Sequence, residues 1–450
     1  MLNPGRPFFF LLAYIVVLYI RPQEYVPVLM GTPLVPVLLL SATGFWLVAQ
    51  AKNFEASQHR LMLCLVVVMF ISVLLTGWLA GAIDVVTEFI PTLLLFYVTA
   101  TSVDTLKKFR DLSIVLTVVS TVIAIHGSEQ FASELGIGWT GAKMIEERIT
   151  YLGFLGDPND LSMAFLMSLP LTIYVSKVSG SFIVRMACYA SAGSVLYGIY
   201  LCNSRGSMLG LLGMVAFYAI GRFGWVRSVI VGPLLLIPLL LLAPSRVGEI
   251  SADEESAAGR IDAWYEGFEM FRAHPLFGVG KGLFTDHHPL TAHNSFVLAI
   301  AELGTVGYFF WLAILIVSAV MLMRILRARE PDAPPPPPSM ATPGTYGAIQ
   351  AAPPVNADMT MSWADLQLAA RTLAYSLIGS LVTAFFLSRS YVVFLFLLVA
   401  MIVAVYQMAR VRWPSFTPVR ATDMTGTLVL FDIGSIIFLW LLTRVLLSIS

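Results

Sequence analysis

The stretch that decides the fold is residues 293–323, which reads HNSFVLAIAELGTVGYFFWLAILIVSAVMLM. It is apolar over more than the ~20 residues that a helix needs to cross a bilayer. The whole chain shares this character, with 58% hydrophobic residues, 12% charged residues and a mean hydropathy of +0.82. Soluble domains carry about twice that share of charge and could not bury so much apolar surface. We therefore predict an all-α, polytopic integral membrane protein.

Apolar runs of sufficient length predict about twelve or thirteen transmembrane helices. They are residues 7–20, 33–50, 60–80, 88–102, 111–126, 160–176, 182–202, 206–221, 226–243, 293–323, 367–388, 391–410 and 427–448. Lys and Arg concentrate in the even-numbered short loops, which indicates a cytoplasmic N-terminus. The long loops before residues 160 and 293 then lie on the outer side.

The spans and loops predict the following organisation along the chain. N-terminal transmembrane helices occupy residues 1–126, a loop on the outer side 127–159, central transmembrane helices 160–243, a large loop on the outer side 244–292, one transmembrane helix 293–323, a Pro-rich cytoplasmic linker 324–362, and C-terminal transmembrane helices 363–450. The linker holds an unbroken run from Pro334 to Pro338 and is typical of a flexible connection.

Charge and cysteine content exclude several classes of protein. Lys and Arg number 27, as do Asp and Glu, so no basic excess indicates nucleic acid as a partner. The three cysteines, Cys64, Cys188 and Cys202, lie within apolar runs and form neither a disulfide framework nor a CxxC pair.

The loop 244–292 contains an amphipathic helix. Its apolar residues recur at helical spacing from near Gly259-Arg260 to His274-Pro275, and they are Ile261, Trp264, Tyr265, Phe268 and Phe271. Three interpretations of this apolar face are open: it lies on the membrane surface, it caps a cavity, or it packs on the helix bundle. Gly278, Gly280 and Gly282 then indicate a sharp turn, since the spacing of a P-loop is missing.

Zinc ligands in proteins include imidazole and carboxylate groups, and four such side chains cluster before the next span: Asp286, His287, His288 and His293. Their spacing matches no tight helical ligand pattern, so we predict no metal site.

His293 stands where the chain re-enters the membrane, at the N-terminus of a predicted helix. The positive end of the helix dipole disfavours imidazolium, and a neutral imidazole is a competent general base. A capping or interfacial role is the alternative for this residue taken alone.

Three arginines, Arg205, Arg260 and Arg389, occur on the outer side against the charge bias. Guanidinium groups bind phosphate oxygens in a bidentate fork, whereas snorkelling to lipid phosphates is the plainer interpretation. Beside a basic histidine, they predict a lipid-linked phosphate or diphosphate as substrate. The histidine would deprotonate an incoming hydroxyl while arginines hold the leaving diphosphate, with no nucleotide, metal or other cofactor required.

Several motifs resemble those of the O-antigen ligase and O-antigen polymerase superfamily of bacterial envelopes. They are Asp157-Pro158-Asn159, Ser204-Arg205-Gly206, Arg260-x3-Trp264, His274-Pro275-Leu276-Phe277-Gly278-x-Gly280, Phe284, His293-Asn294-Ser295-Phe296 and Glu302-Leu303-Gly304-x2-Gly307. The resemblance covers roughly residues 150–320. It implies an inner-membrane enzyme that takes a glycan from undecaprenyl diphosphate at the periplasmic face. The acceptor would be lipid A-core for a ligase, or another lipid-linked glycan for a polymerase.

The resemblance also assigns roles to residues of this chain. Its motif positions match His293, Arg205 and Arg260 as catalytic residues. Substrate-binding candidates are Arg389, from position and charge, together with Trp264, Asp157 and Asn159; a turn-and-cap role is equally open for the last two. Glu302 lies about two and a half helical turns from His293, which argues against direct contact.

Two other functions fit the length and span number. A lipid-linked-sugar flippase or transporter needs charges along a path through the bilayer, and the interior candidates are Asp432, Arg444 and Glu88. A purely structural envelope protein would not need the Arg and His constellation. We expect the transferase, with a slight preference for the ligase, acting by a single inverting displacement because no second carboxylate is placed as a nucleophile.

Overall fold

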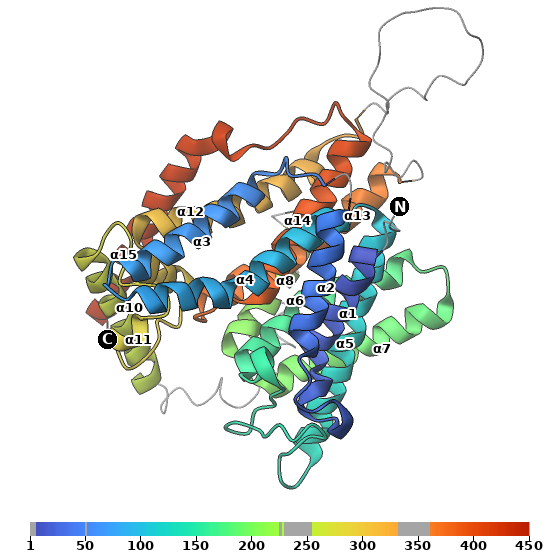
Figure 1. Ribbon diagram of the computed structural model, residues 1–450, viewed down its shortest axis with the longest axis horizontal. Coiled ribbons are helices and arrows are strands. Elements are labelled where there is room, and N and C mark those ends of the chain that lie inside the picture. The colour runs from blue at the N-terminus through green and yellow to red at the C-terminus, as the bar shows by residue number, and fades with distance from the viewer. Residues whose placement is uncertain (1–5, 50–51, 225–226, 229–253, 332–360, 450) are drawn as a thin grey trace, which may run out of the picture.

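The computed structural model describes residues 6–49, 52–224, 227–228, 254–331 and 361–449, and this part of the chain is helical throughout its regular structure (Figure 1). The helices are α1 (Arg6–Ile20), α2 (Leu34–Val48), α3 (Ser57–Leu74), α4 (Leu79–Ser102), α5 (Leu106–Ala132), α6 (Pro158–Val178), α7 (Phe182–Cys202), α8 (Arg205–Phe223), α10 (Glu254–Ala273), α11 (Phe284–His287), α12 (Ser295–Arg327), α13 (Trp363–Phe385), α14 (Val393–Arg412) and α15 (Thr425–Ile449).

The predicted all-α, polytopic fold is confirmed. Within the described ranges, 10 helices are long and apolar enough to cross a membrane, and α1 and α2 are shorter apolar helices of 15 residues. These twelve helices coincide with predicted spans. The remaining span, 226–243, falls almost wholly outside the described residues, as does the proline run 334–338.

Several predicted boundaries need correction. Helix α3 ends at Leu74, before a turn at Gly77 with a φ of 85°, and α4 begins at Leu79, so the boundaries predicted at residues 80 and 88 are wrong. Helix α5 continues to Ala132, so the first long outer loop begins about two turns later than residue 127. Helix α10 begins at Glu254 instead of near Gly259-Arg260, because its first residues are polar and fell outside the apolar pattern. It ends at Ala273, directly before His274-Pro275, as expected.

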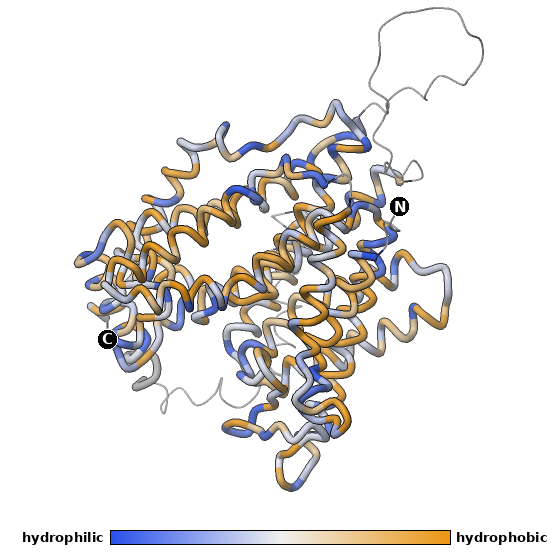
Figure 2. Tube along the Cα trace, viewed as in Figure 1, coloured by the Kyte–Doolittle hydropathy of each residue, from blue (hydrophilic) through white to orange (hydrophobic). Residues whose placement is uncertain are grey.

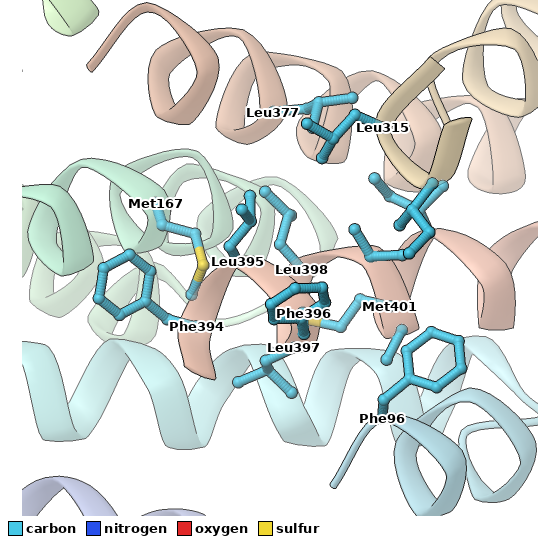
Figure 3. Packing of buried hydrophobic residues seen from close by; sticks show 14 of the residues in the cluster. Phe96, Met167, Leu315, Leu377, Phe394, Leu395, Phe396, Leu397, Leu398 and Met401 are labelled. Atoms are coloured by element: carbon cyan, nitrogen blue, oxygen red, sulfur yellow. The ribbon is translucent and has the colours of Figure 1, made fainter. Parts of the chain in front are cut away.

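Helix α14 lies at the centre of the bundle, against α4, α12 and α13. Its side chains from Phe394 to Ala409 are all buried. Figure 3 shows them packed among residues of four other helices, Phe96, Met167, Leu315 and Leu377. The hydropathy colouring of Figure 2 shows that apolar residues dominate the helix bodies, while polar residues gather at the connections.

Small residues bring α8 close to α13. A Cβ atom added to Gly210 would lie 2.2 Å from Thr383 Oγ1 and 2.7 Å from the Gly379 carbonyl oxygen. One turn earlier, a Cβ on Gly206 would contact Phe386 and Leu387 at 3.2 and 3.3 Å. Close backbone approach of this kind is how membrane helices associate through small residues. It sets the N-terminus of α8, with Arg205, beside the C-terminal end of α13.

Helix α12 is broken at Gly304, whose φ of 61° and ψ of −170° are not helical. The loop before α12 compensates for the break: the N–H groups of Val279 and Gly280 donate to the carbonyls of Ala301 and Glu302 at 2.9 and 3.0 Å. In return, Thr305 N–H donates to the Pro275 carbonyl at 2.9 Å. Broken helices at membrane depth require such replacement partners.

The glycines of this loop allow the same close contact between the loop and the break in α12, which we call the interlock. Gly278, Gly280 and Gly282 all have positive φ, which confirms the predicted sharp turn. A Cβ on Gly304 would lie 2.4 Å from the Leu276 carbonyl carbon, and one on Gly278 would lie 2.3 Å from the Glu302 carbonyl carbon. Two backbones therefore meet where only glycine fits.

Helix α10 packs onto α12 and α15. Trp264 and Phe268 on its apolar face are buried, and the Trp264 ring meets Phe385 edge-on with centroids 5.8 Å apart. Of the three interpretations of this helix, packing on the bundle accounts for its aromatic stripe.

Candidate active site

A cavity of about 440 Å³ opens where α6, α8, α10, α12 and α13 come together. Three residues predicted to be catalytic line it: His293, Arg205 and Arg260. Arg205 and His293 are 88 positions apart in the sequence, with Arg260 between them. The folded helices bring all three residues to one cavity. The other lining residues are Glu146, Arg148, Asn159, Asn203, Gly206, Leu290, Phe386 and Leu387.

His293 occupies the position directly before the N-cap of α12. Its φ of 47° is in the left-handed region, and the Asn294 side chain accepts hydrogen bonds from the N–H groups of Phe296 and Val297 at 2.9 and 3.1 Å. Burial lowers the pKa of His293, and the charges of Arg260 and Arg389 lower it further against the opposing effect of Asp157. The imidazole is therefore neutral at pH 7 and able to accept a proton.

Arg205 begins α8 after a connection of only two residues, Asn203 and Ser204. Asn203 takes the left-handed conformation with φ 47°, and its N–H donates to the Tyr200 carbonyl at 3.0 Å. This short turn ends α7 and starts α8, so Arg205 stands at the first position of α8, where it lines the cavity.

Arg260 enters the cavity from α10. Burial lowers the pKa of this guanidinium, and the neighbouring charge of Arg205 lowers it further. Two cations that repel each other across one cavity create a strong preference for an anion between them.

Arg389 is held differently, beside the cavity and not in its lining. Its guanidinium pairs with Asp157 at 3.1 Å and also with Asp160. Asp157 Oδ1 accepts the N–H of Asn159 at 2.7 Å, so this carboxylate both caps α6 and orients Arg389. Burial raises the pKa of Asp157, but Arg389, the Asn159 N–H and Arg148 together outweigh it and lower the value.

The backbone around Arg389 is fastened to the segment that carries His293. The Ser295 hydroxyl donates to the Leu387 carbonyl at 2.6 Å and accepts the Arg389 N–H at 2.8 Å. The Ser390 hydroxyl donates to the Ser295 carbonyl at 2.7 Å, and Thr291 donates to Ser388. Hydrogen bonds thus join the segment after α13 to the start of α12.

The substrate-binding candidates are divided by the structure. Asn159 lines the cavity, whereas Trp264 is buried against Phe385 and does not. Glu302 is buried in α12 near Lys281 and Tyr391, away from His293, as its helical spacing predicted.

Sequence reasoning missed Glu146, Arg148 and Asp160. The first two come from the loop between α5 and α6, which α5 holds in place: His126 bonds Thr140 at 2.8 Å and the Gln130 side chain donates to the Ala142 carbonyl at 2.8 Å. A basic residue on the outer side, Arg148, was the available signal, because it opposes the charge bias just as Arg205 does.

Left-handed residues concentrate at this cavity. Among the described residues other than glycine, positive φ occurs at Arg21, Glu146, Glu147, Asn203 and His293. Three of these, Glu146, Asn203 and His293, line the cavity. Such conformations are costly and persist where the surrounding structure imposes them, typically at functional sites.

The described residues contain no group of three or more His, Cys, Asp or Glu side chains that could hold a metal ion. The histidines before α12 separate: His288 contacts Asp262 at 3.3 Å and the Leu290 carbonyl at 2.8 Å, while His287 and Asp286 line a different cavity.

Fold and cavity define a multi-pass membrane protein with a basic, histidine-bearing site at one end of its helices. Residues 190–312, just over a quarter of the chain, match the family model described as O-antigen ligase. The match agrees with the resemblance expected from the motifs, and over these residues the chain is similar to the O-antigen ligase family. No curated protein matches the chain in sequence.

Proposed function

We propose that the protein transfers a glycan from undecaprenyl diphosphate to an acceptor hydroxyl at the periplasmic face of the bacterial inner membrane. The single observation that carries this proposal is that His293, Arg205 and Arg260 share one cavity at the ends of their helices. The family match supports glycan ligase or polymerase chemistry in general.

In the proposed reaction, the acceptor hydroxyl donates its proton to the neutral His293 imidazole as its oxygen attacks the anomeric carbon. The bond between that carbon and the diphosphate oxygen breaks, and the leaving group departs with the bond electrons. Arg205 and Arg260 stabilise the charge that develops on the diphosphate. This single displacement inverts the anomeric configuration and uses no metal ion or other cofactor.

The supporting electrostatics come from the cavity itself. Both the lowered pKa of His293 and that of Arg260 arise from burial combined with neighbouring guanidinium groups. A diphosphate would relieve the repulsion between the arginines and then leave as the reaction completes. Arg389 would act from beside the cavity, with Asp157 and Asp160 fixing its position.

The alternative class, a lipid-linked-sugar flippase, finds less support. Arg444 stacks over Tyr265 and Trp440, and Glu88 pairs with Lys281 of the outer loop at 3.3 Å with 70% of its side chain exposed. Asp432 is buried one helical turn from Ser435, which bonds Tyr308 at 2.9 Å. These three charges are dispersed, whereas a transport path needs them in sequence across the bilayer.

The test is transfer in proteoliposomes that contain the full-length protein and an undecaprenyl-diphosphate glycan, with EDTA present. Lipid A-core and a second lipid-linked glycan are offered separately as acceptors. We expect glycan transfer with release of undecaprenyl diphosphate and no loss on adding EDTA. Movement of the lipid-linked sugar across the bilayer without any transfer would instead establish the flippase.

The same experiment separates the two enzymes of the superfamily. We propose the ligase, with lipid A-core as acceptor, and the polymerase is the alternative within this chemistry. Product on lipid A-core alone supports the ligase, and product only on the lipid-linked glycan shows the polymerase.

A further inference from the structure

A second basic cavity, of about 390 Å³, lies at the opposite end of α14 from Arg389. Three arginines from separate parts of the chain line it: Arg60 in the first turns of α3, Arg410 in the last turn of α14, and Arg420 just before the short helix η5 (Ala421–Met424). Because α14 is 20 residues long, about 30 Å separates this cavity from the outer end of that helix.

The walls of this cavity are fastened together by polar contacts between distant segments. The Ala421 N–H donates to the Ser57 hydroxyl at 2.9 Å, and the Val419 N–H donates to the Tyr406 hydroxyl at 2.6 Å. Gln407 donates to the Asn53 carbonyl at 2.9 Å. The connection between α14 and η5 is therefore held against α3 and α14.

Arg410 is oriented by the connection itself, since its guanidinium donates to the carbonyls of Phe416 and, at 3.4 Å, Pro414. Arg324 in the last turn of α12 donates to the Thr417 and Pro418 carbonyls at 3.2 and 3.3 Å. The structure thus fixes the segment that carries Arg420 from two sides.

Charge in the cavity is unbalanced. Glu55 is the one carboxylate in the lining, against three guanidinium groups. In the described part of the chain, the ion pairs include none made by Arg60, Arg410 or Arg420. Guanidinium groups gathered in this way favour an anion with several oxygens, and phosphate matches their geometry.

We propose that this cavity binds a phosphate group, supplied by the headgroup of an anionic phospholipid. The cavity lies at the helix ends on the side of the membrane where Lys and Arg concentrate, which is the cytoplasmic side by the positive-inside rule. Anionic lipids of that leaflet bring phosphate to the same depth, and basic pockets between membrane helices bind such headgroups. This site is separate from the proposed transferase site and does not depend on it.

The test measures lipid binding to the full-length protein in a zwitterionic detergent by calorimetric titration. The probes are dioctanoyl phosphatidylglycerol, dioctanoyl phosphatidylcholine and inorganic phosphate. We expect phosphatidylglycerol to bind more tightly than phosphatidylcholine. The double variant Arg60→Gln/Arg420→Gln should weaken phosphatidylglycerol binding about tenfold or more, as expected for the loss of two charge-assisted contacts.

The matched control is Arg185→Gln/Arg222→Gln, which removes two arginines from α7 and α8 on the same side of the membrane but outside this cavity. It should bind phosphatidylglycerol as the wild type does. The single variant Arg420→Gln, in a connecting segment, provides a second probe if the double variant does not fold, as judged by circular dichroism.

Equal binding of phosphatidylglycerol by the wild type and the double variant would overturn the proposal. So would equal loss in the control pair, or a lack of preference for phosphatidylglycerol over phosphatidylcholine together with no binding of phosphate. Tight binding of inorganic phosphate that is lost in the double variant would confirm the phosphate site and identify a soluble ligand as its source.

Discussion

The middle of α14 and the outer cavity differ in almost every physical respect. Along α14, the buried side chains from Phe394 to Ala409 are nearly all apolar and the helix is continuous. At the outer cavity, helices begin and end, three residues adopt left-handed backbone conformations, and guanidinium groups crowd an imidazole. The difference shows that the buried middle of α14 keeps a regular backbone, while the strained conformations and the buried charges gather where helices end.

The sharpest way to break this comparison is to remove the proposed base. His293→Ala should lower the transfer rate by about 10²- to 10⁴-fold, because the proposed reaction loses the general base that takes the acceptor proton. The helices should remain intact, since the N-cap of α12 is Asn294. Initial rates of glycan transfer in proteoliposomes provide the measurement.

The matched control for this variant is His287→Ala. His287 lies six residues earlier, is exposed and lines a different cavity, so the rate should stay near that of the wild type. An equal loss in both variants would assign the effect to the loop and remove His293 from its role.

The next largest effect concerns the arginines. Arg205→Gln should reduce transfer by about 10²- to 10³-fold, as expected when one stabiliser of developing charge is lost. Arg205→Lys should recover part of the rate, because it keeps the charge and loses the bidentate fork. Steady-state kinetics with varied donor lipid would measure both.

Arg272→Gln is the comparison variant for the arginines. Arg272 ends α10, and its side chain is 79% exposed. If its removal cost as much as the removal of Arg205, general surface charge and not the cavity would explain the loss.

A smaller effect is expected on stability at the break in α12. Gly304→Ala should lower the free energy of unfolding by about 1–3 kcal/mol, because the left-handed backbone and the Leu276 carbonyl leave no room for a Cβ atom. Thermal unfolding in detergent would report this as a lower Tm.

Gly434→Ala in α15 tests whether any added methyl group has this effect. Nothing lies within 4 Å of a Cβ at that position, so the Tm should be unchanged or slightly higher. A Tm for Gly304→Ala that equals this control would contradict the interlock between α12 and the outer loop.

The smallest effect is a shift in pH dependence. The pKa of His293 is lowered, so the rate should fall only as the pH drops below the ordinary histidine value of about 6.5. Asp157 opposes this lowering, and Asp157→Asn should therefore move the acidic limb to still lower pH while Asn retains the cap of α6. The pH profile of kcat/KM measures the position of the acidic limb. A shift of that limb to higher pH in Asp157→Asn would contradict the assignment of His293 as the general base.

Much of this architecture was predictable from local pattern alone. Apolar runs located the ten described helices that are long enough to span a membrane and the two shorter apolar helices α1 and α2, because burial in lipid demands an apolar run whatever the neighbours are. Charge that opposes the inside bias located Arg205, Arg260 and Arg389, and the helix start located His293.

What could not be predicted depends on contacts between distant segments. The break at Gly304 exists because residues 275–280 supply replacement hydrogen bonds, and a helical pattern carries no trace of them. Likewise, Glu146 and Arg148 reach the cavity only because α5 holds their loop. Asp160 pairs with Arg389, a partner more than two hundred residues away in the sequence.

The measurement that tests the account most directly is equilibrium binding of undecaprenyl diphosphate, the leaving group, to the full-length protein in nanodiscs. In the proposed reaction, Arg205 and Arg260 bind the phosphates and His293 transfers the proton. We therefore expect wild-type affinity for His293→Ala and an affinity lower by about 10²-fold or more for Arg205→Gln/Arg260→Gln. Wild-type affinity in the arginine double variant, or equal loss in all variants, would contradict this division of roles within one cavity.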